Sequence, residues 1–399
     1  MKKILFIVLI INSMAFAQQT VKFSAQFRPR FEIDNKDFNS SNQSTTFTLL
    51  RTRLGAMFTP SNNVSGYVEI QDTRAFGEET STIANMKNVD LHEAYIKLDK
   101  IFSLPIDFKV GRFELMYNNH RLIGNSNWGN TARSFDGALL TLNNEKFKID
   151  FFAIKEFEKN LVGDTSDQNM FGAFFDLKLF PNYQIQPIII WQKMTPSTNL
   201  NRFTTGTYIK GNLGNLTHEE EIYYQFGKMK SAKEYDISAY LLAGNVSYNF
   251  NLPLKPFIGI GIDYLSGDNV ADNEYNVFNT IYGTNHKFYG FMDYFTNIPI
   301  DTYNLGLNDL YFKAGLNLKS DLKASLYLHF FNSDKEYILK KGGVTKSFGN
   351  EVDFLFNYNY SKEIAIESGL SFFSPGEIFK EKKGTDNSTW FYLMIIATL

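Results

Sequence analysis

Residues 21–34 read VKFSAQFRPRFEID, and this stretch decides the fold class. Apolar residues recur at nearly every second position, and the residues between them are polar or charged. Successive side chains of a β-strand point to opposite faces, so such a strand has one apolar and one polar face. The apolar face carries Phe23, Ala25, Phe27, Phe31 and Ile33, and the polar face carries Lys22, Ser24, Gln26, Arg28, Arg30, Glu32 and Asp34. The pattern predicts a strand between an apolar environment and water.

The same alternation continues to the end of the chain, in segments separated by turn-forming Asn, Asp, Gly, Ser or Pro. A soluble β-sandwich also alternates, but a typical soluble strand has only about 5–6 residues, and many of these segments are longer. The last segment, residues 389–399, ends the chain on apolar Leu399. Such an ending is typical of the signal that the barrel-assembly machinery of the bacterial outer membrane reads. We therefore predict a transmembrane antiparallel β-barrel.

We predict eighteen strands, an even number as in single-chain bacterial barrels, and sixteen remains open because strand boundaries are soft. They span residues 21–34, 47–59, 64–76, 89–100, 106–117, 135–143, 147–157, 168–180, 184–194, 201–211, 216–229, 235–250, 254–266, 309–319, 322–333, 347–360, 364–374 and 389–399. Short turns such as 59–63 and 318–321 suit the periplasmic side. A barrel of this width encloses an aqueous channel unless it is plugged. The longer insertions suit the outer face or a constriction in the lumen, and they are 77–88, 118–134, 158–167 and 267–308.

Residues 1–17 have the pattern of a cleaved signal peptide. Two lysines precede the apolar run 4–11, and Ala15-Phe16-Ala17 supplies a small-x-small cleavage site. The run is too short for a membrane-spanning helix, which needs about 20 apolar residues. We expect residues 18–399 to form a single outer-membrane barrel whose outer face contacts lipid.

The composition agrees with a barrel and argues against other classes. Aromatic residues make up 16% of the 399 residues, with 39 Phe and 22 Tyr, which favours strands and membrane-interface girdles. A net charge of −2 gives no indication of a nucleic-acid partner. The chain has no Cys, which excludes disulfides and thiolate metal sites. We expect no cofactor.

Arginine is concentrated in the first third of the chain. Arg28 and Arg30 share a strand face, as do Arg51 and Arg53. We predict that these guanidinium groups face the lumen, where such groups hold carboxylates or phosphates and favour anions. The alternative is structural bracing, in which acids such as Glu32 neutralise them. The nine arginines are Arg28, Arg30, Arg51, Arg53, Arg74, Arg112, Arg121, Arg133 and Arg202, and Arg112 is predicted to share a polar face with Glu114.

Four segments carry a longer signature. They read GRFEL at 111–115, RLIG at 121–124, WGN at 128–130 and RSFDGA at 133–138. Together they resemble the signature of the alginate export porin family, and residues 50–53, 90–95 and 286–295 fit it as well. The sequence departs from that signature at Phe113, where the family often has Gln.

The resemblance implies an eighteen-stranded barrel with a narrow, positively charged lumen that passes a polyuronate outward. It also implies that five arginines face the anion and that two acids are their partners: Arg51, Arg53, Arg112, Arg121 and Arg133, with Glu114 and Asp136. The expected function is an outer-membrane channel for anionic solutes, either small molecules or an acidic polysaccharide such as alginate.

Two other functions remain open at this stage. Large loops can plug the lumen of a structural or surface-binding barrel. A barrel hydrolase can use His120 and Ser126, but no GxSxG elbow accompanies them. None of the five histidines lies in an HExxH or similarly spaced metal motif. We therefore predict no catalytic residue and no metal ligand, and we take the channel as the main interpretation.

Overall fold

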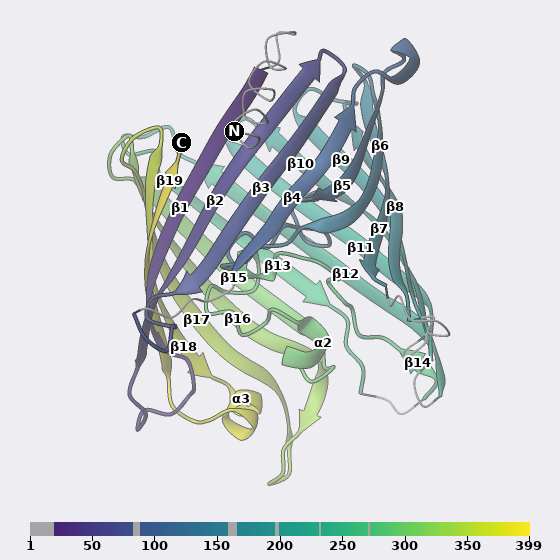
Figure 1. Cartoon of the computed structure of the whole chain (residues 1–399). Coiled ribbons are helices and arrows are strands. Elements are labelled where there is room, and N and C mark those ends of the chain that lie inside the picture. The colour runs from purple at the N-terminus through teal and green to yellow at the C-terminus, as the bar shows by residue number, and fades with distance from the viewer. Residues whose placement is uncertain (1–19, 83–87, 159–165, 196–198, 231–232, 270–271) are drawn as a thin grey trace.

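The computed structural model describes residues 20–399, except 83–87, 159–165, 196–198, 231–232 and 270–271. The expected signal peptide lies outside the described residues. The chain forms one antiparallel wall that closes on itself, because the first strand, β1 (Thr20–Asn35), pairs with the last, β19 (Ser388–Thr398) (Figure 1). The sheet has nineteen strands, and β14 (Glu274–Tyr275) is a two-residue strand within a loop, so eighteen strands form the wall. The predicted fold and strand count are confirmed.

The remaining strands of the wall follow one another round the barrel in sequence order. They are β2 (Thr45–Ser61), β3 (Val64–Ala75), β4 (Val89–Leu98), β5 (Ile106–Phe113), β6 (Phe135–Asn143), β7 (Phe147–Phe157), β8 (Gln168–Leu177), β9 (Tyr183–Met194), β10 (Leu200–Leu213), β11 (Leu216–Lys230), β12 (Glu234–Asn249), β13 (Phe257–Leu265), β15 (Leu307–Asn317), β16 (Leu322–Ile338), β17 (Val344–Asn359) and β18 (Ile364–Pro375).

The two ends of the barrel differ in the length of their connections. The start of β1, the end of β19 and the short turns lie at one end, which is the upper end in Figure 1 and is periplasmic in barrels of this kind. The longest loops, 114–134 and 266–306, start at the other end, where the short helices α2 (Ile298–Asp301) and α3 (Glu377–Lys382) also lie. None of the described helices is long and apolar enough to cross a membrane.

The outer face of the wall is apolar, as the alternation predicts. Phe23, Leu54 and Ile222 are among many large apolar side chains that are exposed there. Rings also contact one another along this face, from Trp191 to Phe203 with centroids 5.8 Å apart and from Phe203 to Phe226 with centroids 5.3 Å apart. Apolar bands bordered by aromatic girdles are how transmembrane barrels meet lipid.

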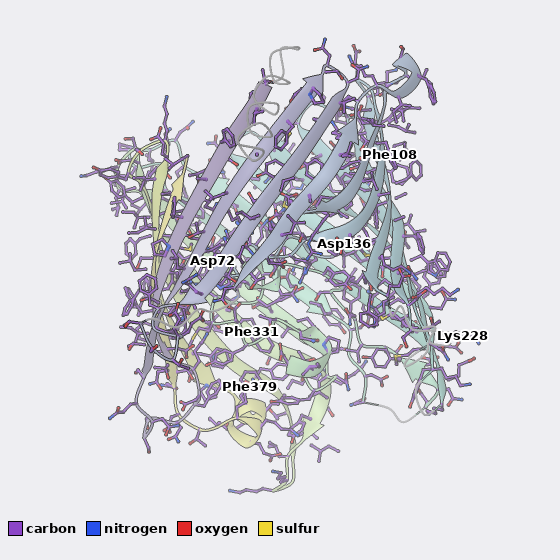
Figure 2. All side chains as sticks on the ribbon, in the orientation of Figure 1. Asp72, Phe108, Asp136, Lys228, Phe331 and Phe379 are labelled. Atoms are coloured by element: carbon purple, nitrogen blue, oxygen red, sulfur yellow. The ribbon has the colours of Figure 1, made fainter. Side chains whose placement is uncertain are left out.

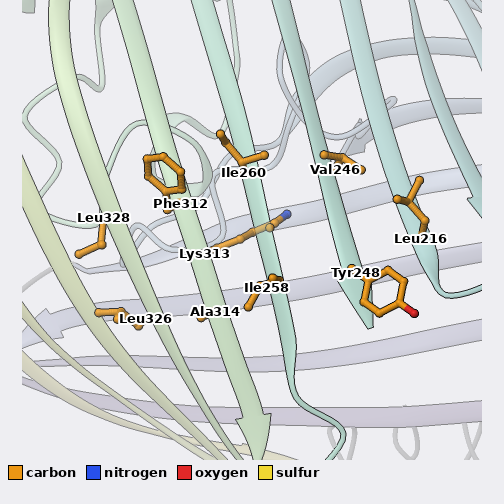
Figure 3. Close-up of a pocket in the computed structure, with 11 residues that line it drawn as sticks. Leu216, Val246, Tyr248, Ile258, Ile260, Phe312, Lys313, Ala314, Leu326 and Leu328 are labelled. Carbon is orange, nitrogen blue, oxygen red and sulfur yellow. The ribbon is translucent and has the colours of Figure 1, made fainter. Parts of the chain in front are cut away.

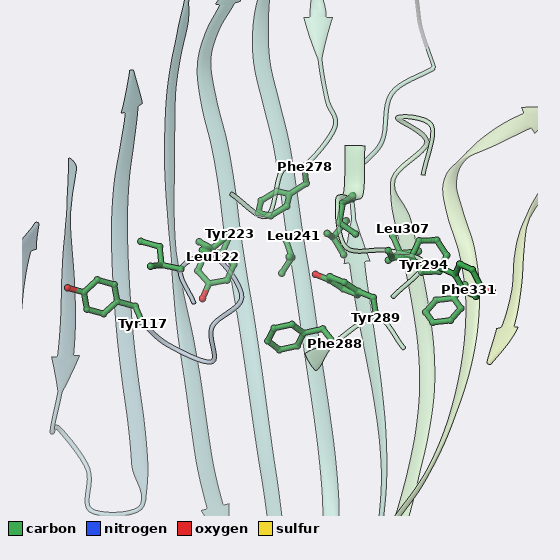
Figure 4. Close-up of a cluster of buried hydrophobic side chains, with 14 of the residues drawn as sticks. Tyr117, Leu122, Tyr223, Leu241, Phe278, Phe288, Tyr289, Tyr294, Leu307 and Phe331 are labelled. Carbon is green, nitrogen blue, oxygen red and sulfur yellow. The ribbon is translucent and has the colours of Figure 1, made fainter. Parts of the chain in front are cut away.

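The lumen contains an apolar layer that the wall alone does not supply. Loops 114–134 and 266–306 fold inward and bury Leu122, Phe278 and Phe288 against wall residues such as Leu241 (Figure 4). A parallel bridge between Ile123 and Tyr282 joins the two loops. The loops therefore narrow the lumen over part of its cross-section.

One predicted strand is longer than the strand observed. The alternation predicts a strand over 106–117, but β5 ends at Phe113. From Glu114 the chain turns into the lumen, where the Glu114 carboxylate meets His92 and Asn125 and Leu115 is buried. Inward polar partners and apolar burial outweigh continuation of the strand, so loop 114–134 begins four residues earlier than expected.

Candidate solute-binding site in the lumen

Three arginines of β1 and β2 hold the backbone of loop 114–134. Arg28 donates a hydrogen bond to the Gly129 carbonyl at 2.9 Å, and Arg30 donates to the Trp128 carbonyl at 2.6 Å. Arg51 donates to the Asn127 carbonyl at 3.2 Å. The arginines face the lumen, as predicted, but carbonyl oxygens of the loop occupy their guanidinium groups. Buried carbonyl groups need such donors, so these contacts brace the loop.

Arg53 belongs to a network of side chains. It contacts Glu69 at 3.5 Å and Glu114 at 3.3 Å. Glu114 also meets His92 at 2.8 Å and accepts a hydrogen bond from Asn125 at 2.6 Å. Burial in itself raises the pKa of Glu114, but the hydrogen bonds from His92 and Asn125 outweigh it and hold the pKa below its usual value. The charge of Arg53 is thus paired with acids.

Arg121 lies deeper in the lumen and is almost fully buried. Its guanidinium group meets Asp263 of β13 at 2.8 Å and Glu221 of β11 at 3.2 Å, and it lies 3.8 Å from the ring centroid of Phe288. Burial lowers the pKa of Arg121, but the charges of Asp263 and Glu221 outweigh burial and raise the pKa well above its ordinary value. This contact fixes loop 114–134 to the opposite wall.

Arg133 joins the two inward loops. It donates hydrogen bonds to the carbonyl of Gly124 at 2.9 Å and to the carbonyl of Tyr282. Burial lowers the pKa of the Arg133 guanidinium. Like Arg28 and Arg51, Arg133 is committed to backbone oxygens of the loops.

The position of Arg112 corrects the prediction that all these arginines face the lumen. On β5 it shares a face with exposed Val110, whereas Phe113 on the other face is fully buried. Arg112 pairs at 2.9 Å with Asp136, whose side chain is 60% exposed on the outer face of β6 (Figure 2). The predicted pairing of Arg112 with Glu114 on one face fails because the strand ends between them.

A cavity of about 480 Å³ lies between the two loops and the periplasmic half of the wall. Among its charged residues, Arg121 pairs with Asp263, and Lys210 pairs with Glu219 at 2.7 Å.

Two lysines and one acid of the cavity remain without such a pair. Lys287 bonds to Asn119, Lys313 bonds to Asn245 at 2.8 Å, and the structure shows no ion pair of Lys287, Lys313 or Glu367 within the described residues. The charged side chains that line the cavity, four basic and three acidic with the histidines neutral, therefore carry a net positive charge. Its aromatic lining is Trp128, Phe288, Phe291, Tyr311, Tyr327 and Tyr392.

Our interpretation of the sequence missed these lysines. Lysine is spread along the whole chain. Its distribution therefore singled out no region, whereas arginine is concentrated in the first third. The strand alternation does place Lys313 on the polar face of its segment, and that phase was the available signal. Lys287 lies in η2 (Asn285–Lys287), a single turn of 3₁₀ helix in a loop whose path no strand pattern predicts.

A family model described as alginate export matches residues 19–392 of the chain. The chain belongs to the alginate export family. No curated protein matches it in sequence. The bacterial outer membrane is accordingly its location. In this alginate export family chain, the signature segments build and anchor the first inward loop, 114–134. These segments are 111–115, 121–124, 128–130 and 133–138.

Solved outer-membrane structures share the fold of this family member. OccAB4 of Acinetobacter baumannii aligns with a TM-score of 0.63 at 12% identity, covering 96% of this chain and 99% of that chain. The outer membrane protein OprD of Pseudomonas aeruginosa aligns with a TM-score of 0.63 at 11% identity, covering 95% and 94%. At this level of identity the likeness concerns the fold alone.

The residues considered for a hydrolase are held by other contacts in this alginate export family chain. The backbone N–H of Ser126 donates to the hydroxyl of Thr284 at 3.1 Å, and the carbonyl of His120 accepts from the Thr284 N–H. Within the part of the chain that the structure describes, no hydrogen bond joins the His120 ring to the Ser126 hydroxyl. A hydroxyl nucleophile needs such a base within hydrogen-bond reach, so this geometry does not favour hydrolysis.

Proposed function

We propose that the protein is an outer-membrane channel for carboxylated solutes, with acidic saccharides as the preferred class. The single observation that carries this proposal is the cavity in which Lys287 and Lys313 bond to asparagines and, within the described residues, form no ion pair. Cations that line a pore raise the local concentration of anions. The lysine ammonium is a compact charge with rotatable donors, so it can bind a carboxylate and release it again as the solute moves through the channel.

The aromatic lining supports a saccharide rather than a bare inorganic anion. Ligand sites are lined mostly by apolar and aromatic side chains, and a few polar groups fix the orientation of the ligand. Six rings and two available ammonium groups fit that description. The arginines contribute indirectly in this proposal, because Arg28, Arg30 and Arg51 hold the loop that forms one side of the cavity.

Recordings from purified protein in a planar bilayer test the proposal. We expect stable single-channel steps and a reversal potential that favours chloride over potassium. Short oligomers of a uronic acid should interrupt the current at concentrations at which neutral oligomers of the same length have no effect. Equal block by both oligomers, or preference for potassium, would contradict the proposal.

A plugged barrel is the second candidate, and the buried apolar layer favours it. Leu122, Ile123 and Phe278 are almost fully buried inside the barrel, and packing of this kind can close a lumen. A bilayer that stays silent with correctly folded protein would support the plug. Steps that appear only after the Arg28→Ala and Arg51→Ala changes would show that loop 114–134 closes it.

A further inference from the structure

Four titratable side chains of β15, β16 and β17 meet on the lumenal face of the wall. Asp309, His329, Glu351 and Asp353 are each at most 3% exposed. His329 lies directly opposite Glu351 in the strand register. Its Nδ1 lies 2.8 Å from Asp309 Oδ2, and its Nε2 lies 3.9 Å from Asp353 Oδ2. The cluster therefore contains three carboxyl groups and a single imidazole.

Apolar groups lie behind and in front of this cluster. The outer side chains of β15 and β16, Phe312 and Leu328 among them, line an apolar groove on the face that meets lipid (Figure 3). On the lumenal side, loop 266–306 lies against the cluster and buries Met292, which is 1% exposed. An ionised carboxylate is strongly disfavoured in such surroundings unless a counter-charge or hydrogen-bond donors compensate it.

The charges of the cluster do not balance if all three carboxyl groups are ionised. A protonated His329 neutralises one carboxylate, and Asp309 is the acid within hydrogen-bond distance of its ring. Two other basic groups act on the cluster, Arg121 and His286, but both are already paired with other acids. At least one of the two remaining carboxyl groups must then be neutral, because two carboxylates in contact do not both ionise in a buried site.

The contacts of Glu351 and Asp353 indicate where the proton lies. One oxygen of each is occupied, since Glu351 Oε1 accepts from the Met292 N–H at 2.9 Å and Asp353 Oδ1 accepts from the Ser371 hydroxyl. No N–H or O–H group of the described residues reaches Glu351 Oε2 or Asp353 Oδ2. The two carboxyl groups lie within hydrogen-bond reach of each other, and a hydrogen bond between carboxyl oxygens needs a proton on one of them. Among these residues no group of three or more acidic or histidine side chains can hold a metal ion, so a proton is the cation that fits.

We propose that Glu351 and Asp353 share one buried proton, and that this proton fastens loop 266–306 to the wall. The loop backbone lies directly over Glu351, because Gly290 has a φ of +80° and a Cβ atom there would lie 2.7 Å from both carboxylate oxygens. Loss of the proton leaves two buried anions in contact, and the carboxyl group that must turn away from its neighbour is the one that holds the Met292 N–H. The fastening does not depend on which solute the channel passes.

Infrared spectroscopy of the folded barrel tests for the proton, because the carbonyl stretch of a protonated carboxyl group is separate from the bands of carboxylates. We expect this band in the wild type at neutral pH and its loss in Glu351→Gln and in Asp353→Asn. Either amide supplies a permanent N–H in place of the proton and keeps the net charge of the cluster. Asp136→Asn, on the outer face, is the control and should keep the band. Absence of the band from the wild type, or its survival in both cluster variants, would overturn the proposal.

Hydrogen exchange measured by mass spectrometry tests the fastening of the loop. Glu351→Leu removes the acceptor of the Met292 N–H, so peptide 288–295 should exchange about tenfold faster than in the wild type. Glu351→Gln keeps that acceptor and should exchange at the wild-type rate, and the heat-modifiable gel shift shows that each barrel is folded. As pH rises, loss of the carboxyl band and faster exchange should occur together in the wild type, after correction for intrinsic exchange, and Glu351→Gln should show neither. Equal protection of the wild type and a folded Glu351→Leu, or a band that disappears without any change in exchange, would overturn the proposal.

Discussion

Two groups of cations face the lumen, and they differ in what receives their hydrogen bonds. Arg28, Arg30 and Arg51 donate to carbonyl oxygens of loop 114–134. Lys287 and Lys313 border a cavity, and among the described residues their hydrogen bonds go only to the side chains or backbone of asparagines. A guanidinium fork holds several acceptors in fixed directions, whereas an ammonium is a mobile point charge. The difference shows that a cation in a lumen braces the structure or serves a solute according to its partner.

Removing the most deeply committed arginine should have the largest effect. Arg121→Leu leaves Glu221 and Asp263 buried without their counter-charge. Breaking a buried pair in this way costs about 3–5 kcal/mol. Urea unfolding in lipid vesicles, followed by tryptophan fluorescence, should show the loss. Arg74→Leu is the control, since Arg74 is half-exposed on the outer face and should change little. Equal stability of the two variants would remove the bracing role of Arg121.

A smaller effect is expected where the arginine contacts neutral oxygens. Arg51→Gln should cost about 2 kcal/mol, because hydrogen bonds from charged groups contribute about 1.5–3 kcal/mol. The freed loop should also raise single-channel conductance or widen its fluctuations. If conductance and stability both stay unchanged, the other contacts of loop 114–134 are sufficient to hold the loop without Arg51.

The contact between Trp128 and its neighbours should contribute less again. The ring of Trp128 stacks on His286 with centroids 4.0 Å apart and lies 4.1 Å from the Arg30 guanidinium carbon. Trp128→Leu keeps an apolar side chain and removes the ring contacts, which are worth about 1 kcal/mol. The same unfolding assay measures this loss, and a cost as large as that of Arg121→Leu would reverse the proposed ranking.

Anion preference should also depend on pH. Burial lowers the pKa of Lys287 below that of an exposed lysine. As pH rises, Lys287 therefore loses its charge earlier than surface lysines, and the preference for chloride should fall. Lys287→Arg keeps its charge throughout, so reversal potentials of this variant should change less than those of the wild type over the same pH interval. A wild-type channel that is equally insensitive to pH would exclude Lys287 as a source of the preference.

Much of the fold could be predicted from the sequence because the residues of each wall strand alternate between an apolar face for lipid and a polar face for the lumen. The stretch 21–34 has an apolar and a polar face that the barrel uses as predicted, and the terminal segment 389–399 closes the wall against it. The alternation says nothing about how a loop folds. For that reason the end of β5 at Phe113 and the inward course of loop 266–306 were not predictable.

The arginines show the same limit within the site. Their faces on 21–34 and 47–59 were predictable from strand phase, but their acceptors belong to residues 127–129, which no local pattern brings near. Arg112 was expected on the lumenal face because a strand reaching residue 117 would place it on the same face as Glu114. The strand ends at Phe113, and Arg112 lies on the outer face. Lys287 and Lys313 become distinct only once the structure shows which cations border the cavity without an ion pair among the described residues.

The central claim is that the lumenal lysines, and not the arginines, set the ion preference. Reversal potentials in a potassium chloride gradient test it most directly, with two charge-removing variants compared in one bilayer system. Lys287→Gln with Lys313→Gln should abolish most of the preference for chloride, while Lys341→Gln with Lys362→Gln, at exposed turns, should leave it unchanged. Arg28→Lys with Arg51→Lys keeps both charges and should also leave it unchanged. Retention of the full chloride preference after loss of Lys287 and Lys313 would contradict the account.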